Sequence, residues 1–348
     1  MRKLYLHVGV HRTATTSIQR FLRANFVALV SKGYLYPFGV TRHNALVSKI
    51  RYGTLSAEDM AQDLLRRMDA KGPHVQAAVL SDEDISAIVD VSVFAPLMRH
   101  FDVKVVVSLR RQDLWLESWY LQNVKWQWDA SLAHISFAEF LERRDEFFWI
   151  DYASRLAQYE AVFGPGSVVA GVFEEAEMPD GPIEAFLAMI GITDQTGFGD
   201  KLHHNSSLSP LASEFMRQMP LDEMVGPDRK LVEQAFLDMD AGLVTNGSKL
   251  LMPLAQRQAV MAEFADSNAA VARAYFGRDQ LFRTPLPAAE APLADATLPT
   301  DGAVLMRDFM VPLMRALAKQ MTGARLAADL PGERKGQGPK KDRVNPRT

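Results

Sequence analysis

The sequence predicts an α/β fold in which a central parallel sheet lies between two layers of helices, with a helical C-terminal half. Three observations support this class. Short apolar runs alternate with helical patterns in the first half of the chain, as in parallel sheets. Residues 103–109 are apolar except for Lys104 and Ser108, as in a strand covered on both faces. From Pro182 onward the apolar residues mainly follow helical spacing.

The alternation sets the expected order of elements. Strands are predicted at residues 4–10, 75–80, 103–109 and 167–173. Helices are predicted at 15–29, from the third strand to about residue 128, and at 152–163, 183–190, 210–219, 230–238 and 253–276. Because ligands of such sheets bind at the carboxyl ends of the strands, functional residues are expected in the loops after residues 10, 80 and 109.

The chain divides by composition into four parts. Residues 1–283 are predicted to form one α/β domain, and the Pro- and Ala-rich residues 284–303 a linker or strap. An amphipathic helix at 304–330 is expected to pack on the domain. The basic residues 331–348 are expected to be a disordered tail.

Composition restricts the function classes. The net charge of −3 argues against a nucleic-acid-binding protein. The absence of cysteine excludes disulfides, thiolate metal sites and cysteine nucleophiles, and no metal-ligand spacing stands out. The sequence has neither a signal-peptide pattern nor an apolar run long enough for a transmembrane segment. We therefore expect a cytoplasmic protein.

The stretch HVGVHRTATTSIQRF, residues 7–21, reads as strand, loop and helix, and is P-loop-like. Gly9 and Thr16 fit the phosphate-binding pattern of nucleotide triphosphatases, whereas Ala14 replaces its second glycine and Thr15 its lysine. A helix N-terminus binds anions through its free N–H groups, and Arg12 is the nearby cation. The alternative is a simple Thr/Ser helix cap.

A second candidate element follows the third strand. Arg110 ends that strand, and Ser118 lies eight residues later on the next helix. An arginine and a serine in these places can converge on one phosphate. A surface arginine and an unrelated helical serine are the alternative.

Together the two elements resemble the sulfotransferases that use 3′-phosphoadenosine 5′-phosphosulfate (PAPS), in particular their divergent bacterial branch. The family's Lys-x-Gly-Thr-Thr appears as Arg12-Thr13-Ala14-Thr15-Thr16, and its Arg-x7-Ser as Arg110 to Ser118. VLSDEDI, DYASRLAQYEAVFG, FLAMIGI, HHNSSLS and YFGRDQLF follow in the order seen in that branch. The resemblance implies PAPS as co-substrate, without a metal. Its 3′-phosphate would contact Arg110 and Ser118, and its 5′-phosphosulfate would contact His11, Arg12, Thr13, Ala14, Thr15, Thr16 and Ser17.

The resemblance also suggests how catalysis would proceed. Arg12 would stabilise the leaving phosphate, and His43 or Glu83 would accept the proton of an acceptor hydroxyl or amine. Arg12 and Ala14 depart from the family's lysine and glycine. If position 14 needs a positive φ, alanine costs about 1 kcal/mol there. The acceptor is expected to be a small molecule, lipid or saccharide.

Two other functions fit the same residues. One is a catalytically inactive sulfotransferase-like scaffold that binds the nucleotide, and the other is a divergent P-loop nucleotide kinase. The tryptophans between residues 115 and 128 do not decide between these functions. Trp115 and Trp119 have the spacing of a stripe that faces the hydrophobic core. Trp126 and Trp128, near the expected end of that helix, are candidates for reaching an acceptor.

Overall fold

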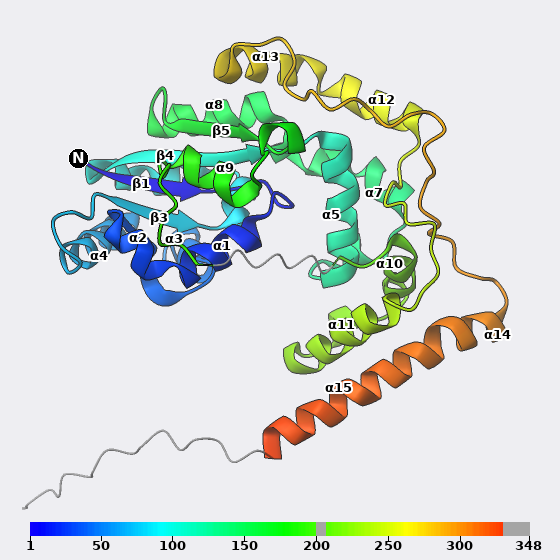
Figure 1. Cartoon of the computed structure of the whole chain (residues 1–348). Coiled ribbons are helices and arrows are strands. Elements are labelled where there is room, and N and C mark those ends of the chain that lie inside the picture. Colours follow the sequence, from blue (N-terminus) through cyan, green and yellow to red (C-terminus); the bar gives the residue numbers. More distant parts are fainter. Residues whose placement is uncertain (200–206, 330–348) are drawn as a thin grey trace, which may run out of the picture.

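The computed structural model describes residues 1–199 and 207–329, and it confirms the α/β class (Figure 1). Five parallel strands form one sheet in the order β2-β3-β1-β4-β5. The strands are β1 (Arg2–His7), β2 (Tyr34–Leu35), β3 (Ala77–Ser81), β4 (Phe101–Leu109) and β5 (Val168–Val172). Strand β2 was not predicted, because a two-residue edge strand has no sequence periodicity.

Strand β1 is central, and its side chains from Leu4 to His7 are buried on both faces of the sheet. Leu4 and Leu6 belong to one hydrophobic core, and Tyr5 belongs to the other. At its carboxyl end, His7 is aligned with Ser81 of β3 and Val106 of β4. The loops that follow β1 and β3 therefore leave the sheet side by side.

Helices cover both faces of the sheet and make three layers (Figure 1). Helices α1 (Thr15–Ala24) and α9 (Pro182–Met189) contribute Phe21 and Phe186 to the core that contains Tyr5. Helices α4 (Ala57–Asp69) and α8 (Tyr152–Phe163) pack on the opposite face. The further helices are α2 (Phe26–Ser31), α3 (Asn44–Arg51), α5 (Gln112–Trp126), α6 (Ala130–Ala133), α7 (Phe137–Glu142), α10 (Pro210–Arg217), α11 (Gly226–Asp240), α12 (Leu254–Glu263) and α13 (Ala265–Phe276).

Two predicted helices are each divided in the structure. The helix predicted at 15–29 breaks at Asn25, whose side-chain amide donates to the Phe21 carbonyl and accepts the Gly199 N–H at 2.6 Å. The helix predicted at 253–276 breaks at Phe264, between α12 and α13. Neither break has a proline or glycine, which are the usual sequence signals of a helix end.

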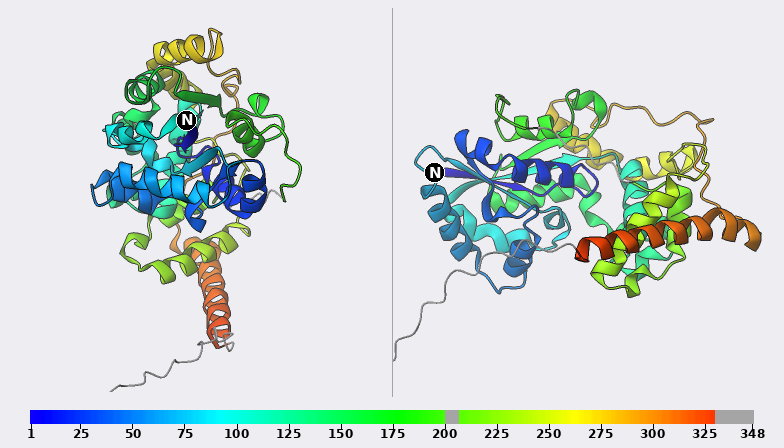
Figure 2. Two further views of the ribbon diagram at one scale, coloured as in Figure 1. Left: turned by 90° about the vertical axis from the view of Figure 1, so that its left-hand side faces the viewer. Right: turned by 60° about the horizontal axis from the view of Figure 1, so that its bottom comes forward.

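The chain after α13 crosses the surface as an extended strap, residues 277–301, before the C-terminal helical segment. Within the described residues the strap contains no helix or strand. The segment then runs through α14 (Gly302–Leu305), a π-helical turn (Met306–Met310) and α15 (Val311–Asp329). Helix α15 packs along α11, outside the three layers (Figure 2). The predicted tail at 331–348 and residues 203–206 of HHNSSLS lie outside the described residues.

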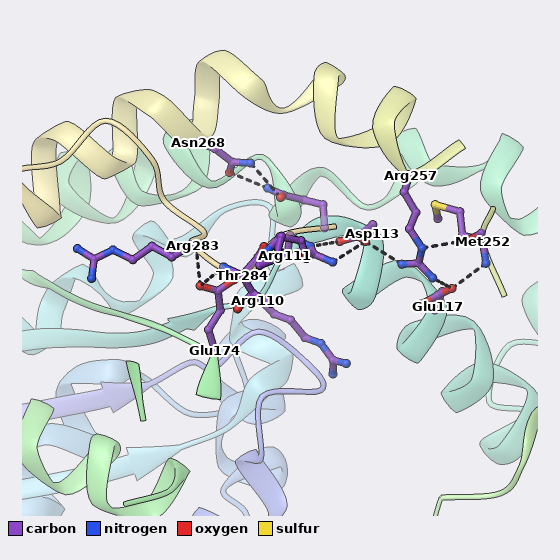
Figure 3. Close-up of polar contacts among 12 residues, drawn as sticks. Arg110, Arg111, Asp113, Glu117, Glu174, Met252, Arg257, Asn268, Arg283 and Thr284 are labelled. Carbon is purple, nitrogen blue, oxygen red and sulfur yellow. Dashed lines mark hydrogen bonds and ion pairs between the residues drawn. The ribbon is translucent and has the colours of Figure 1, made fainter. Parts of the chain in front are cut away.

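A buried ionic cluster attaches the C-terminal half to α5 (Figure 3). Arg257 pairs with Asp113 at 2.7 Å and with Glu117. Arg111 forms a two-pronged pair with Asp113 and donates to the Thr284 carbonyl. All four charged side chains are at least nine-tenths buried, so the cluster fixes α12 and the strap against α5. None of the described helices combines the length and the apolar character needed to cross a membrane.

Candidate nucleotide site

The loop between β1 and α1 has an unusual backbone. Gly9 has φ 47°, and a Cβ atom there would lie 2.5 Å from the Thr15 methyl carbon, so only glycine fits. Arg12 and Ala14 also have positive φ, 71° and 59°. Non-glycine residues seldom adopt this region, and those that do cluster at ligand sites. The Thr13 hydroxyl donates to the Val10 carbonyl at 2.6 Å and closes the loop.

The N-terminus of α1 faces this loop. Ala14 is the N-cap residue, and no side chain in the described part of the chain caps the helix. The simple Thr/Ser cap considered from the sequence is therefore wrong. The first-turn N–H groups keep their capacity to bind an anion. Of the hydroxyl residues in this turn, Thr15 is buried, Ser17 half-buried and Thr16 exposed.

Arg12 connects the loop to helix α5. Its Nε donates to the Ser118 hydroxyl at 2.6 Å, and its Nη1 donates to the Gln122 side-chain oxygen at 3.1 Å. Ser118 and Gln122 lie one helical turn apart and so share a face of α5. The structure thus brings together two predicted residues, Arg12 and Ser118, and adds Gln122, which the sequence analysis missed.

Arg110 joins the same group from the end of β4. Its Nη1 donates to the Arg12 carbonyl at 2.7 Å, and in Figure 3 its side chain points away from the Arg111–Asp113 pair. Burial and then the charge of Arg12 lower the pKa of Arg110 to about 10. Within the described residues, neither Arg12 nor Arg110 has a carboxylate at ion-pair distance. Two like charges held together in this way favour an anionic ligand.

A third cation extends the positive region. Burial lowers the pKa of Lys125, Glu233 opposes this shift, and the charge of Arg12 adds to it. Ser118, Gln122 and Lys125 have i, i+4, i+7 spacing, which places them along one face of α5. That spacing was a signal available in the sequence.

Glu83 lies on the other side of the loop. Its Oε2 accepts from the Gln19 amide at 2.7 Å, and its Oε1 is 3.3 Å from an Arg42 nitrogen. Its Cβ is within 3.8 Å of the position that a Gly9 Cβ would take, so the carboxylate adjoins the loop. Gln19 is buried and also donates to the Ser81 hydroxyl. Sequence reasoning missed Gln19, because an isolated glutamine on a helix gives no signal.

Arg42 organises the acidic turn that contains Glu83. It pairs with Asp82 at 2.6 Å and with Asp84 at 2.5 Å. Burial raises the pKa of Asp82 to about 6 in spite of the Arg42 charge, and its Oδ2 has no hydrogen-bond partner among the described residues. Next to this turn the buried His11 ring lies 3.4 Å from Asp84 and packs on Trp119. His11 therefore links the loop to the acidic turn after β3 and to helix α5.

His43, the other predicted base, has a different environment. Its Nδ1 accepts the Ser81 N–H at 3.0 Å, and its Nε2 donates to the Pro37 carbonyl at 3.1 Å. The ring is 1% exposed, and burial lowers its pKa. Nδ1 thus binds the end of β3 and Nε2 binds Pro37 within the same segment, so neither nitrogen is free to accept a substrate proton in this structure. The geometry favours Glu83 over His43.

Comparisons with known proteins add the following. No family model matches the chain. An uncharacterised protein from Archaeoglobus fulgidus is 31% identical over 183 residues, which is 51% of this chain and 47% of that protein. The chain thus spans about half the length of this curated relative. The crystal structure of a sulfotransferase from Alicyclobacillus acidocaldarius is similar with a TM-score of 0.38 and 18% identity, over 68% of this chain and 95% of that chain. At these values, neither match assigns a function.

Proposed function

We propose that this chain is a sulfotransferase that moves a sulfuryl group from PAPS to a hydroxyl or amine of a small molecule, lipid or saccharide. The observation that carries the proposal is the contact between the β1–α1 loop, which contains Arg12, and the segment from Arg110 to Ser118. Arg110 binds the carbonyl of Arg12, and the Arg12 side chain binds Ser118. Two arginines without a carboxylate partner within the described residues lie beside an uncapped helix N-terminus, which suits a ligand with more than one phosphate.

The residues would divide the nucleotide between them. The N–H groups at the start of α1, with Arg12, would hold the 5′-phosphosulfate. Arg110 and the Ser118 hydroxyl would hold the 3′-phosphate. Serine retains its own proton for donation, since its oxygen is the acceptor in the contact with Arg12.

In the proposed reaction an acceptor oxygen attacks the sulfur, and the bond between sulfur and the bridging phosphate oxygen breaks. Glu83 would take the proton of the acceptor, while Gln19 orients its carboxylate. Arg12 and the α1 amides would stabilise the charge that develops on the leaving phosphate. Positioning and electrostatics therefore supply the catalysis, and adenosine 3′,5′-bisphosphate (PAP) is the by-product.

Binding of PAP tests the first step. We expect calorimetry to show binding by the wild type and a loss of at least about 100-fold in Arg110→Ala, because charge-assisted hydrogen bonds to the 3′-phosphate are removed. Arg66→Ala is the matched control, since Arg66 is 73% exposed on α4, and should bind like wild type. ATP with Mg²⁺ is tested in parallel, and binding of ATP with Mg²⁺ but not PAP would favour the nucleotide-kinase alternative and sink the proposal.

Two matched variants identify the base. Glu83→Gln should lower kcat by about 10²–10⁴-fold while PAP affinity is kept. His43→Asn should affect thermal stability more than kcat, because both ring nitrogens bind backbone groups. A folded His43→Asn variant with a large loss in kcat, beside an active Glu83→Gln, would reverse this assignment.

One observation favours an inactive scaffold as the second candidate. The Arg12 guanidinium is engaged by Ser118 and Gln122 on α5, and position 14 is an alanine with positive φ. A scaffold would bind PAP and transfer nothing across a panel of hydroxyl and amine acceptors. Transfer by the double variant Arg12→Lys, Ala14→Gly, without transfer by the wild type, would support the scaffold interpretation.

A further inference from the structure

Two tryptophans stack at the C-terminal end of α5, where Trp126 is the last helical residue and Trp128 lies two residues further on. The rings of Trp126 and Trp128 are nearly parallel, with 8° between their planes and 5.5 Å between their centroids. Trp128 is 59% exposed. Exposing a large aromatic face to water is unfavourable, and such faces mark interaction sites when they are held in place.

Gln127 holds this stack in a fixed geometry. Its backbone is left-handed, with φ 39° and ψ 45°, at a position where helices usually have glycine. Its buried side chain accepts the N–H groups of Leu221 and Asp222 and donates to the Met216 carbonyl. These three bonds offset the unfavourable backbone conformation. They also fix the reversal of direction that brings Trp126 and Trp128 face to face.

The stack lies at the end of the polar face of α5. Ser118 and Gln122 of that face contact Arg12, and the Lys125 Nζ lies 5.4 Å from the centre of the Trp126 ring. Eight residues separate Ser118 from Trp126, roughly 12 Å along a helix. Figure 1 shows α5 running from beside the carboxyl ends of the strands toward α10. A ligand that reaches both the loop and the stack must therefore be elongated.

We infer that the Trp126–Trp128 stack is a saccharide-binding platform, and that the acceptor in the proposed reaction is an oligosaccharide. One sugar ring lies with its C–H face on the exposed face of Trp128 and presents its hydroxyls at the rim. A further ring of the same chain extends along α5 and brings a hydroxyl to Glu83. The second half of this inference rests on the proposed function, whereas the platform does not.

The polarity of the surroundings favours a saccharide over a small aromatic acceptor. Drug-sized apolar ligands bind in pockets that enclose most of their surface, whereas Trp128 is open to water. The Lys125 ammonium lies over the Trp126 ring, and Asp129, the exposed residue that follows Trp128, caps α6 with its carboxylate. A sugar ring, apolar on one face and rich in hydroxyls at its edge, matches a flat aromatic surface with a polar border.

The test measures saccharide binding without any transfer. The probes are hexasaccharides of maltose, cellulose, chitin and chondroitin types, followed by intrinsic tryptophan fluorescence and calorimetry. We expect the wild type to bind at least one of them, and Trp128→Ala to bind it at least about tenfold more weakly. Trp128→Phe should recover part of the affinity. Tyr52→Ala is the matched control, because Tyr52 is an exposed aromatic, 71% accessible, on another element.

PAP binding is measured on the same variants, which separates the two proposals. Trp128-dependent saccharide binding supports the platform whether or not PAP binds. PAP binding with no saccharide binding, or saccharide binding that Trp128→Ala leaves unchanged, would overturn the platform and leave the proposed function standing. Binding of 2-naphthol through Trp128, without any hexasaccharide, would also overturn it.

Discussion

Replacing Ala14 by glycine tests the conformation of the loop directly. Ala14 has φ 59° and ψ 19°, a left-handed conformation that costs an L-residue roughly 1–2 kcal/mol. Glycine removes this cost but loses about 0.5–1 kcal/mol more chain entropy on folding. The difference predicts that Ala14→Gly stabilises the protein by about 0.5–1 kcal/mol.

Urea unfolding is the suitable assay. For 348 residues the unfolding entropy is roughly 0.7 kcal/mol per kelvin, so the melting temperature would rise by only about 1 °C. The urea midpoint should rise at unchanged slope. Ala157→Gly is the matched control, because Ala157 is exposed in the interior of helix α8. The same substitution there should destabilise by about 1 kcal/mol.

Opposite signs for the two substitutions are the decisive result. If Ala14→Gly destabilises as much as Ala157→Gly, then position 14 is not left-handed, and the loop conformation on which the proposed nucleotide site depends is refuted. A change in slope for Ala14→Gly would mean that the substitution altered the unfolded or native ensemble instead of relieving the backbone.

Two further predictions concern buried titratable side chains. Arg257→Met should lower the free energy of unfolding, measured in urea, by about 3–5 kcal/mol, because it leaves Glu117 buried without its cation. The double variant Arg257→Met, Glu117→Leu should lose less stability than the single variant. An equal loss in the two variants would refute this reasoning. Burial lowers the pKa of His7 to about 3, so the unfolded state binds its proton first, and stability falls as the pH drops below 6.5. By pH 5 the loss from His7 is about 2 kcal/mol. His7→Asn keeps a polar side chain that does not titrate opposite the Ser81 hydroxyl. It should remove this part of the pH dependence of the unfolding free energy, measured by urea titrations from pH 7 to 5. An unchanged dependence on pH would show that His7 is not buried in its neutral form.

The sequence predicted the parts of the site that are continuous in the chain. The spacing from Arg110 to Ser118 indicated one cluster, and the structure places Arg110 on the Arg12 carbonyl and Ser118 on the Arg12 side chain. The condition placed on Ala14, a positive φ, is met as well. The spacing within residues 110–118 and the positive φ at Ala14 follow from local backbone geometry, which a short stretch of residues specifies, whereas the contacts of Arg110 and Ser118 with Arg12 join distant segments.

Partners contributed by distant segments were not predictable. Gln19 meets Glu83 only because β1 and β3 are neighbours in the sheet. The family resemblance suggests His43 as a base, and only its neighbours in the fold show that both ring nitrogens are occupied by backbone groups. Burial and hydrogen-bond competition decide such roles, and both depend on residues far away in the chain.

By itself the sequence determined the alternation of strands and helices and the parallel sheet, and it predicted the strand, loop and helix of the candidate anion site. Periodicity, glycine placement and helix polarity act over a few residues, so they can be read from the chain in order. The tertiary structure alone decided that Arg12 reaches α5, that Glu83 is held by Gln19, and that Trp126 and Trp128 stack beside a left-handed Gln127. Those outcomes depend on which surfaces the three layers bring into contact, and contacts between distant segments are set by packing the whole chain at once.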